Sequence, residues 1–106
     1  MTNQEINEAV HKKLGGDKVV EPVLLHTTNE IFMQHIPAKD YCGSIQAAWE
    51  VVGWITKTSR SFSLYVNSGR KWTCSIGSWG NVEPDAEVNL ADTAPMSICL
   101  AFLKLP

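Results

Sequence analysis

The chain has 106 residues, of which 44% are hydrophobic and 19% are charged, and its formal net charge is −2. This composition is typical of a folded protein and excludes an intrinsically disordered chain. The charge argues against a non-specific nucleic-acid binder, which needs a basic surplus to displace counterions from phosphates. The length indicates one domain over residues 1–106.

Cysteine usage and the N-terminal residues indicate a cytoplasmic protein. The chain has three widely spaced cysteines, Cys42, Cys74 and Cys99, and no C-x-x-C pair. Disulfide scaffolds use an even and denser set, so we expect reduced thiols in a cytosol. Residues 1–16 lack the apolar core of a signal peptide, and no apolar run is long enough to span a bilayer. We therefore expect no membrane partner.

The first predicted element is an amphipathic helix. Thr2 and Glu5 match the capping box, in which each side chain accepts the other residue's backbone amide. Gly15 and Gly16 provide a C-terminal stop. Apolar residues recur between these signals at helical spacing, at Ile6, Ala9, Val10 and Leu14. The pattern indicates a helix that packs one face on the core.

Residues 17–40 are the least regular part of the sequence. Two short apolar runs look like strands, but Pro22 and Pro37 interrupt them, so we expect a long excursion with at most a short strand. His26 and His35 lie here without Cys, Asp or Glu at ligand spacing, so we expect solvated or hydrogen-bonded histidines and no metal site.

A second helix is predicted to follow. Ser44 is its expected N-cap, with Asp40 as a rival. The helix presents a wide buried face made of Ile45, Ala48, Trp49, Val52 and Ile55. Their spacing of three and four residues places Trp49 in the core.

The period of the apolar pattern then changes from helical to two. Residues 61–67 and 72–76 alternate apolar and polar side chains, as in a half-buried antiparallel pair with Trp72 on the core side. The sequence "NSGR" supplies the turn between them, with Gly69 free to adopt positive φ. A third, weaker strand follows, with Ala86, Val88 and Leu90 on one face.

The last predicted element is a helix that is apolar almost all round. Asp92 or Thr93 caps it, and Pro95 lies in its first turn, where no amide donor is needed. Such a helix is buried on more than one side, under the sheet, in a subunit interface, or both.

These elements define an α+β fold with the order α-α-β-β-β-α. A three-stranded antiparallel meander needs cover on its apolar face. Three helices exceed what one small face needs, so we expect a sheet sandwiched by helices, or a helix shared with a second subunit. The protein is therefore expected to be a homo-oligomer.

Several segments resemble the phage ABA sandwich domain and the similar phage NinX-type proteins. They are "MTNQEINEAVHKKLG", "DYCGSIQAAWEVV", "KWTCSIG" and "ADTAPMSICLAFLKL". The matching positions are Tyr41, Ile45, Ala48, Trp49, Glu50, Trp72, Cys74, Thr93, Pro95, Ile98, Cys99, Leu100, Ala101, Leu103 and Lys104. The resemblance implies a helix–sheet–helix sandwich and a phage origin, with the host cytoplasm as location. It implies no catalytic residues.

The sequence carries no enzyme motif. No nucleophile elbow frames a serine, the loop around Gly77 lacks the lysine of a phosphate-binding loop, and no base neighbours a cysteine. We therefore expect neither catalysis nor a cofactor.

A binding site for a small nucleotide-like anion is the sharper hypothesis. Aromatic faces, arginines that can hold a phosphate bidentately, and the free amides at helix starts are its ingredients. The candidate residues are Tyr41, Ser44, Arg60, Arg70, Lys71, Trp79 and Thr93. The opposing interpretation is that the cap residues only cap helices and that the arginines are solvated. Trp79 stands apart because glycines flank it in a loop.

Three functions remain open at this point. The first is a phage counter-defence protein, a non-catalytic sponge that sequesters a host immune signal such as a cyclic ADP-ribose-type or cyclic oligonucleotide molecule. The second is a protein-interaction module that inhibits a host factor. The third is an accessory phage protein with no ligand. Under the first hypothesis, Arg60→Ala or Arg70→Ala should weaken binding without unfolding the protein.

Overall fold

The computed structural model describes residues 2–15, 20–24, 31–35, 38–58, 60–80 and 82–106, and of the ranges 20–24 and 31–35 it describes the backbone. The elements are α1 (Asn3–Lys13), β1 (Val20–Leu24), β2 (Ile31–His35), α2 (Ile45–Lys57), β3 (Arg60–Val66), β4 (Trp72–Ser78), β5 (Ala86–Ala91) and α3 (Ala94–Lys104). The predicted set of three helices and a three-stranded meander, in this order, is confirmed. None of the helices in these ranges has the length and apolar character needed to cross a membrane.

Each helix begins at a cap residue that the sequence predicts. Thr2 and Glu5 form both hydrogen bonds of the capping box. Ser44 caps α2 and Thr93 caps α3, each by accepting the backbone amide three residues further on. Asp40 does not cap α2, because its carboxylate accepts a hydrogen bond from a side chain of α1. The rules of helix capping are local, which explains why they transfer so directly from sequence to structure.

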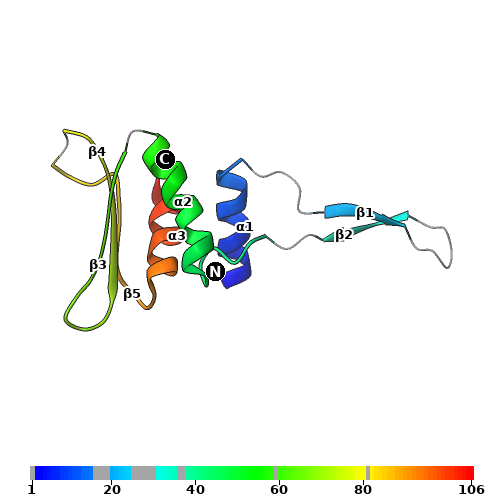
Figure 1. Ribbon diagram of the computed structural model, residues 1–106, viewed down its shortest axis with the longest axis horizontal. Coiled ribbons are helices and arrows are strands. Elements are labelled where there is room, and N and C mark those ends of the chain that lie inside the picture. The colour runs from blue at the N-terminus through cyan, green and yellow to red at the C-terminus, as the bar shows by residue number, and fades with distance from the viewer. Residues whose placement is uncertain (1, 16–19, 25–30, 36–37, 59, 81) are drawn as a thin grey trace.

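The main sheet is antiparallel, with the strand order β3-β4-β5, and the helices lie on one side of it (Figure 1). α2 packs on β3, α3 packs on β4 and β5, and α1 packs on α3 beyond them. The expectation of a sheet sandwiched between helices is therefore wrong in its layering. The extra helix α1 covers α3 instead of the second face of the sheet, because α3 is apolar on both sides.

The core is centred on α3. Phe102, Ile98 and Cys99 are fully buried there, between the sheet, α2 and α1. Lys13 of α1 closes the C-terminal end of this helix: its Nζ donates to the carbonyl of Phe102 at 2.8 Å and to that of Leu105. This cation satisfies carbonyls that the end of a helix leaves without partners.

The buried face of α2 differs from the predicted one. Trp49 was expected in the core, but 58% of its surface is exposed, and Ile45 is also exposed. The buried face consists of Ala48, Val51, Val52 and Ile55. The small side chain of Ala48 lets α2 approach closely, so the larger apolar residues at the side of the stripe lie outside the contact.

A bulge in β5 changes the predicted third strand. Trp72 pairs with Ala91 and Cys74 pairs with Val88, so β5 contains one more residue than the matching stretch of β4. Leu90 takes a φ of 63° and is 65% exposed, although alternation places it on the core side. Ala91 is buried in its place, because the extra residue inverts the alternation beyond it.

The turn between β3 and β4 places its left-handed residue one position later than predicted. The Asn67 amide donates to the Lys71 carbonyl, and the Asn67 side chain accepts the amides of Gly69 and Lys71. Arg70 has a φ of 60°, whereas Gly69 is not in the positive region. A three-residue hairpin loop requires a left-handed residue at its third position, and here that residue is an arginine.

Residues 17–40 contain a two-stranded antiparallel hairpin, in contrast to the expected single short strand. β1 pairs with β2 from Val20 opposite His35 to Leu24 opposite Ile31. Pro22 lies within β1, opposite Met33; each strand of a two-stranded sheet has a free edge, where a residue without an amide is tolerated. The hairpin projects from the helices (Figure 1) and the molecule measures 60 × 30 × 21 Å. Its radius of gyration is 16.9 Å, against about 13 Å for a compact domain of this length.

The three cysteines are free and buried, as the sequence predicts of reduced thiols. Burial raises the pKa of Cys74 to about 12, and the same cause raises the pKa of Cys99 to about 12. Both thiols are thus protonated at neutral pH, the form that is a poor nucleophile.

We predict that Arg70→Gly stabilises the protein. A left-handed conformation costs a non-glycine residue roughly 1–2 kcal/mol, while glycine loses roughly 0.5–1 kcal/mol of additional chain entropy on folding. The arginine side chain is exposed, so the substitution removes no core packing. We expect the free energy of unfolding in urea to rise by about 0.5–1 kcal/mol.

Gly69→Ala is the matched control. Its added Cβ meets only the Asn67 side chain, at the ordinary contact distance of 3.4 Å. We expect it to be neutral or slightly stabilising, because alanine restricts the unfolded chain. A loss above about 1 kcal/mol in Gly69→Ala, without a gain in Arg70→Gly, would show that Gly69 is the left-handed residue after all.

We also predict a loss of stability in alkali that depends on Cys74 and Cys99. Their folded pKa values lie above the ordinary thiol value of 9.0. The stabilisation by the neutral buried thiols is complete below that value and is lost as the pH rises towards 12. Denaturation midpoints measured from pH 8 to pH 11 should fall less steeply in Cys74→Ala/Cys99→Ala than in the wild type. Parallel curves would contradict this, since lysine and tyrosine titrations are common to both proteins.

Candidate functional site

Chain topology divides the predicted binding residues between two ends of the sheet. Short connections make α2 antiparallel to β3 and α3 antiparallel to β5, and β3 and β5 run in the same direction. The two helices are therefore parallel and begin at the same end (Figure 1). The predicted residues at this end are Ser44, Arg70, Lys71 and Thr93. Arg60 and Trp79 lie at the opposite end, since β3 spans about 20 Å at roughly 3.3 Å per residue.

Tyr41 is not available to a ligand. It is only 4% exposed and belongs to the hydrophobic core. Burial raises the pKa of its phenol, so the group is neutral at physiological pH. The ring of Tyr41 thus packs in the core of the protein, and not on the surface where a predicted ligand would meet it.

Arg60 is engaged at its own end of the sheet. Its Nε lies 3.6 Å from an Asp85 carboxylate oxygen, and its Nη1 donates to the Thr58 hydroxyl at 3.4 Å. The same Asp85 oxygen accepts the Ser78 hydroxyl at 2.5 Å. The Nε is buried without a hydrogen bond among the described residues. This arginine is thus paired with Asp85. Sequence spacing did not predict the pair, because Asp85 lies in a loop.

The start of α3 offers little to an anion. The Thr93 hydroxyl accepts the Met96 amide, and Pro95 has no amide to donate. Asp92 precedes the cap and pairs with Lys71, which lowers the pKa of its carboxyl. Lys71, which was predicted to attract a phosphate, is therefore paired with a carboxylate. The Thr93 hydroxyl already caps the helix.

Arg70 is exposed at this end, in the β3–β4 turn, where its backbone amide donates to the Asn67 carbonyl at 3.0 Å. Its guanidinium has no partner among the described residues, whereas Lys71 pairs with Asp92 and Arg60 lies beside Asp85.

The start of α2 is a better anion site. The Ser44 hydroxyl accepts the Ala47 amide at 3.3 Å, which leaves the amides of Ile45 and Gln46 without a described acceptor. Free amides and the positive end of the helix dipole attract anions. A hollow of about 250 Å³ opens here, lined by Lys39, Ser44, Gln46, Ala47 and Glu50.

Lys39 and Glu50 contribute opposite charges to this hollow. The Lys39 ammonium lies 2.7 Å from a Glu50 carboxylate oxygen, and both side chains are largely exposed. The hydrogen bond to Glu50 raises the pKa of Lys39, so the lysine is fully charged. An exposed pair of this kind is worth about 0–1 kcal/mol, and an anion can therefore replace the carboxylate at little cost.

Trp49 borders the hollow. It lies three residues after Gln46, which makes the two side chains neighbours on the helix surface. Its exposed indole also contacts Phe62 edge-on, with 6.4 Å between ring centroids. Sequence reasoning missed Lys39, Gln46 and this role of Trp49. Their signal was weak, because a tryptophan at helical spacing is indistinguishable from a core residue.

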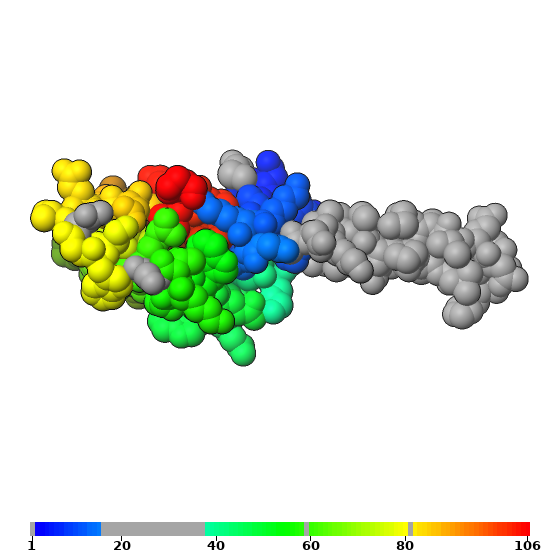
Figure 2. All heavy atoms as spheres, turned by 90° about the horizontal axis from the view of Figure 1, so that it is seen from above, coloured from blue at the N-terminus to red at the C-terminus, as the bar shows by residue number. Residues whose placement is uncertain are grey.

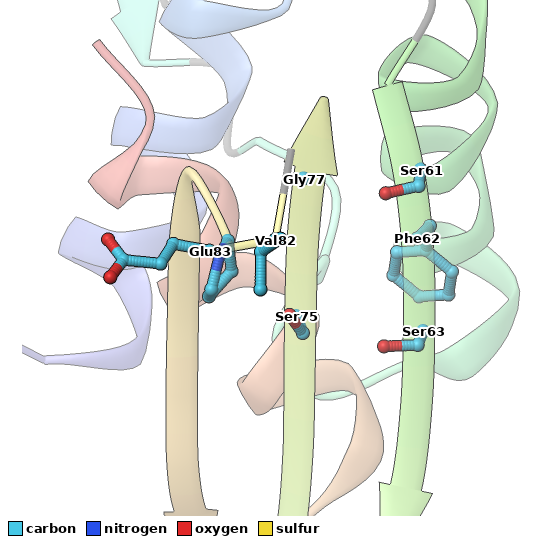
Figure 3. Close-up of a pocket in the computed structure, with 8 residues that line it drawn as sticks. Ser61, Phe62, Ser63, Ser75, Gly77, Val82 and Glu83 are labelled. Carbon is cyan, nitrogen blue, oxygen red and sulfur yellow. The ribbon is translucent and has the colours of Figure 1, made fainter. Parts of the chain in front are cut away.

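A second, smaller cleft lies on the open face of the sheet. Figure 3 shows the hydroxyls of Ser61 and Ser63 directed from β3 towards β4, with Val82 and Glu83 across from them beside β4 and β5. The cleft has a volume of about 150 Å³, and Glu83 is its only charged residue. Hydroxyls beside a carboxylate suit a neutral polar group and repel an anion. The alternating serines of β3 are the sequence signal for it.

No group of three or more His, Cys, Asp or Glu side chains suited to a metal ion occurs in the part of the chain that the structure describes. His26 and the side chain of His35 lie outside this part.

The comparisons with known proteins identify the family. Its sequence model, the phage ABA sandwich domain, matches residues 9–103, which include the sheet, α2 and α3. Neither the curated proteins nor the solved structures contain a match. The match agrees with the resemblance of the motifs and indicates a small phage protein. The chain belongs to the phage ABA sandwich domain family.

Proposed function

We propose that this phage protein binds an anionic, nucleotide-derived signal of the host's immune response and sequesters it without turnover, in the cytoplasm of the infected cell. The observation that carries the proposal is the hollow at the start of α2. It combines free backbone amides with a charged lysine, and the exposed indole of Trp49 lies three residues after Gln46 on the same helix. These three features match a phosphate and the base attached to it.

The phosphate is expected to lie against the helix start. The amides of Ile45 and Gln46 donate to its oxygens, and Lys39 exchanges Glu50 for it. Phosphate oxygens accept charge-assisted hydrogen bonds, which are about twice as strong as neutral ones. Arg70 adds a positive charge at the same end of the molecule and can guide the anion to the site.

The base is expected to stack on Trp49. Stacking of a base on an aromatic side chain is worth about 1–3 kcal/mol and depends little on the identity of the base. The hollow of about 250 Å³ lies below the usual range of roughly 300–1,000 Å³ for small-molecule sites. It therefore encloses the phosphate and leaves the rest of a nucleotide on the adjacent helix surface.

The side chains of the hollow support binding without turnover. The hollow contains no cysteine and no histidine, and its one hydroxyl, on Ser44, already accepts the Ala47 amide. We expect no cofactor, because none is needed to hold an anion reversibly.

We predict that Lys39→Ala and Gln46→Glu each weaken binding of a cyclic ADP-ribose-type or cyclic oligonucleotide signal by about tenfold or more. One variant removes the positive charge, worth roughly 1–2 kcal/mol, and the other places a carboxylate at the amides. Gln46→Glu should also raise thermal stability slightly, since a negative charge favours a helix start. Titration calorimetry and thermal shift would measure both effects.

Lys57→Ala is the matched control, because it removes the same charge from the other end of α2. It should bind as the wild type does, and so should Arg60→Ala, whose guanidinium pairs with Asp85. Arg70→Ala should bind two- to threefold more weakly.

The wild type should deplete the signal from solution and release it unchanged on heating. Recovery of an altered molecule would show an enzyme. A protein that neither depletes nor is stabilised by any of these nucleotides would refute sequestration.

A second candidate function is inhibition of a host protein through the loop after β4. Trp79 is 75% exposed and Val82 is fully exposed. The yellow atoms of the β4–β5 connection lie at the left end of the molecule, away from the blue atoms of α1 (Figure 2). Exposed apolar residues of this kind are typical of a protein contact. Loss of host-protein binding in Trp79→Ala, with Lys39→Ala unaffected, would favour this function.

A further inference from the structure

β1 and β2 form an arm that stands apart from the rest of the molecule. The arm consists of the strands Val20–Leu24 and Ile31–His35, and among the described residues no third strand pairs with it. Both strands lie beyond α1 in Figure 1, away from the main sheet, and no helix lies along them there. A two-stranded sheet is only marginally stable in water, and independent stability requires further strands or packing against a helix. The arm therefore lacks what would stabilise it within one chain.

The strands of the arm are almost free of charge. Their sequences are VEPVL and IFMQH, in which Glu21 is the one acidic residue and neither lysine nor arginine occurs. One face of the arm is apolar except for a histidine: by the register it contains Val20, Pro22, Leu24, Ile31, Met33 and His35. Removing apolar surface of this kind from water favours association with another element or another chain.

The two edges of the arm differ in their capacity to pair with a further strand. On β1, Pro22 has no amide to donate and Glu21 is charged, and both features oppose pairing at an edge. β2 contains no proline and no Asp, Glu, Lys or Arg. The edge of β2 is therefore the one that is open to another strand.

The position of Pro22 also determines which groups β2 presents at that edge. In an antiparallel ladder, pairs of residues that exchange both hydrogen bonds alternate with pairs that exchange none. Pro22 lies opposite Met33 and has no amide, so this pair is of the second kind. The amides and carbonyls of Ile31, Met33 and His35 accordingly point away from β1.

We propose that the β2 edges of two copies of the chain pair antiparallel about a two-fold axis at Met33, which joins the arms into a four-stranded sheet of order β1-β2-β2-β1. This register sets Met33 opposite its own copy and Ile31 opposite His35 of the other copy. All of these residues present their amides and carbonyls at the free edge, so each pair can exchange both hydrogen bonds. An isologous contact requires an edge that is complementary to itself, and β2 in this register meets that requirement.

The helices of the two copies do not meet in this arrangement. His35 lies at the end of β2 that leads back towards α2, and Ile31 lies at the other end. Antiparallel pairing places the two different ends side by side, so the helices of the two copies lie beyond opposite ends of the four-stranded sheet (Figure 1). The contact does not rest on the proposed ligand, and Lys39→Ala should dimerise as the wild type does.

Met33→Pro tests the pairing of backbone groups. Proline removes an amide that points away from β1, so the arm keeps its own hydrogen bonds while the dimer loses those at the two-fold axis. We expect wild-type protein to sediment as a dimer at micromolar concentration, and Met33→Pro to raise the dissociation constant at least tenfold. Circular dichroism checks that the variant retains its helices.

Charge exchange at the same position tests the two-fold axis. The Cα atoms of the two copies of Met33 lie roughly 5.5 Å apart in a hydrogen-bonded pair, so like charges there repel each other. Met33→Lys and Met33→Glu should each weaken the dimer at least tenfold. An equimolar mixture of the two variants should restore it.

Glu21→Lys is the control, because it places a lysine on the outer strand of the proposed sheet. It should leave the dimer intact. A monomeric wild type overturns the proposal, and so does a dimer that resists Met33→Pro. A mixture of the charged variants that stays monomeric while both are folded overturns it as well. Disruption by Glu21→Lys as strong as that by Met33→Lys would place the contact on β1 and would equally refute pairing through β2.

Discussion

The burial of α3 is the constraint on which the rest of this structure depends. A helix that is apolar around most of its circumference cannot lie on the surface of one sheet, because its outer side would remain in water. β4 and β5 cover one side of it, and α2 and α1 cover the others. The fully buried hydroxyl of Ser97 donates to the Ala94 carbonyl at 2.7 Å. The N-terminal helix is therefore part of the core, and Lys13 fastens it to the last carbonyls of the chain.

The same packing determines the electrostatics. Short connections reverse the chain between α2 and β3 and again between β5 and α3, and the meander returns β5 to the direction of β3. Both helix dipoles then point their positive ends towards one end of the molecule. The two helix starts differ in their attraction for anions. Pro95 has no amide to donate and Asp92 adds a negative charge at the start of α3, whereas α2 retains two amides without a described acceptor. Of the two helix starts, the one beside Lys39 is therefore the anion site that we propose.

A sheet that is covered on one face only leaves an open face and two edges. The open face carries the serines of β3 and β4 and is compatible with water. The β5 edge is bent by its bulge and contacted by Lys104, and α2 packs on β3, with Trp49 against Phe62. An arrangement that buries α3 so completely within one chain removes the need for a helix shared between subunits.

The sequence by itself determined the features that depend on residues within a few positions of each other. The caps Ser44 and Thr93, the alternation in β3 and the order of elements follow from local backbone chemistry, and the motifs identified the family. Tertiary structure decided the rest. Trp49 is exposed because α2 approaches the sheet through Ala48, and Tyr41 is buried because the core closes over it. The part of the candidate site formed by the Ser44 cap was predictable from local sequence, because the start of any helix has free amides. Which cations lie beside it depends on contacts between distant segments, and only the folded chain brings these together.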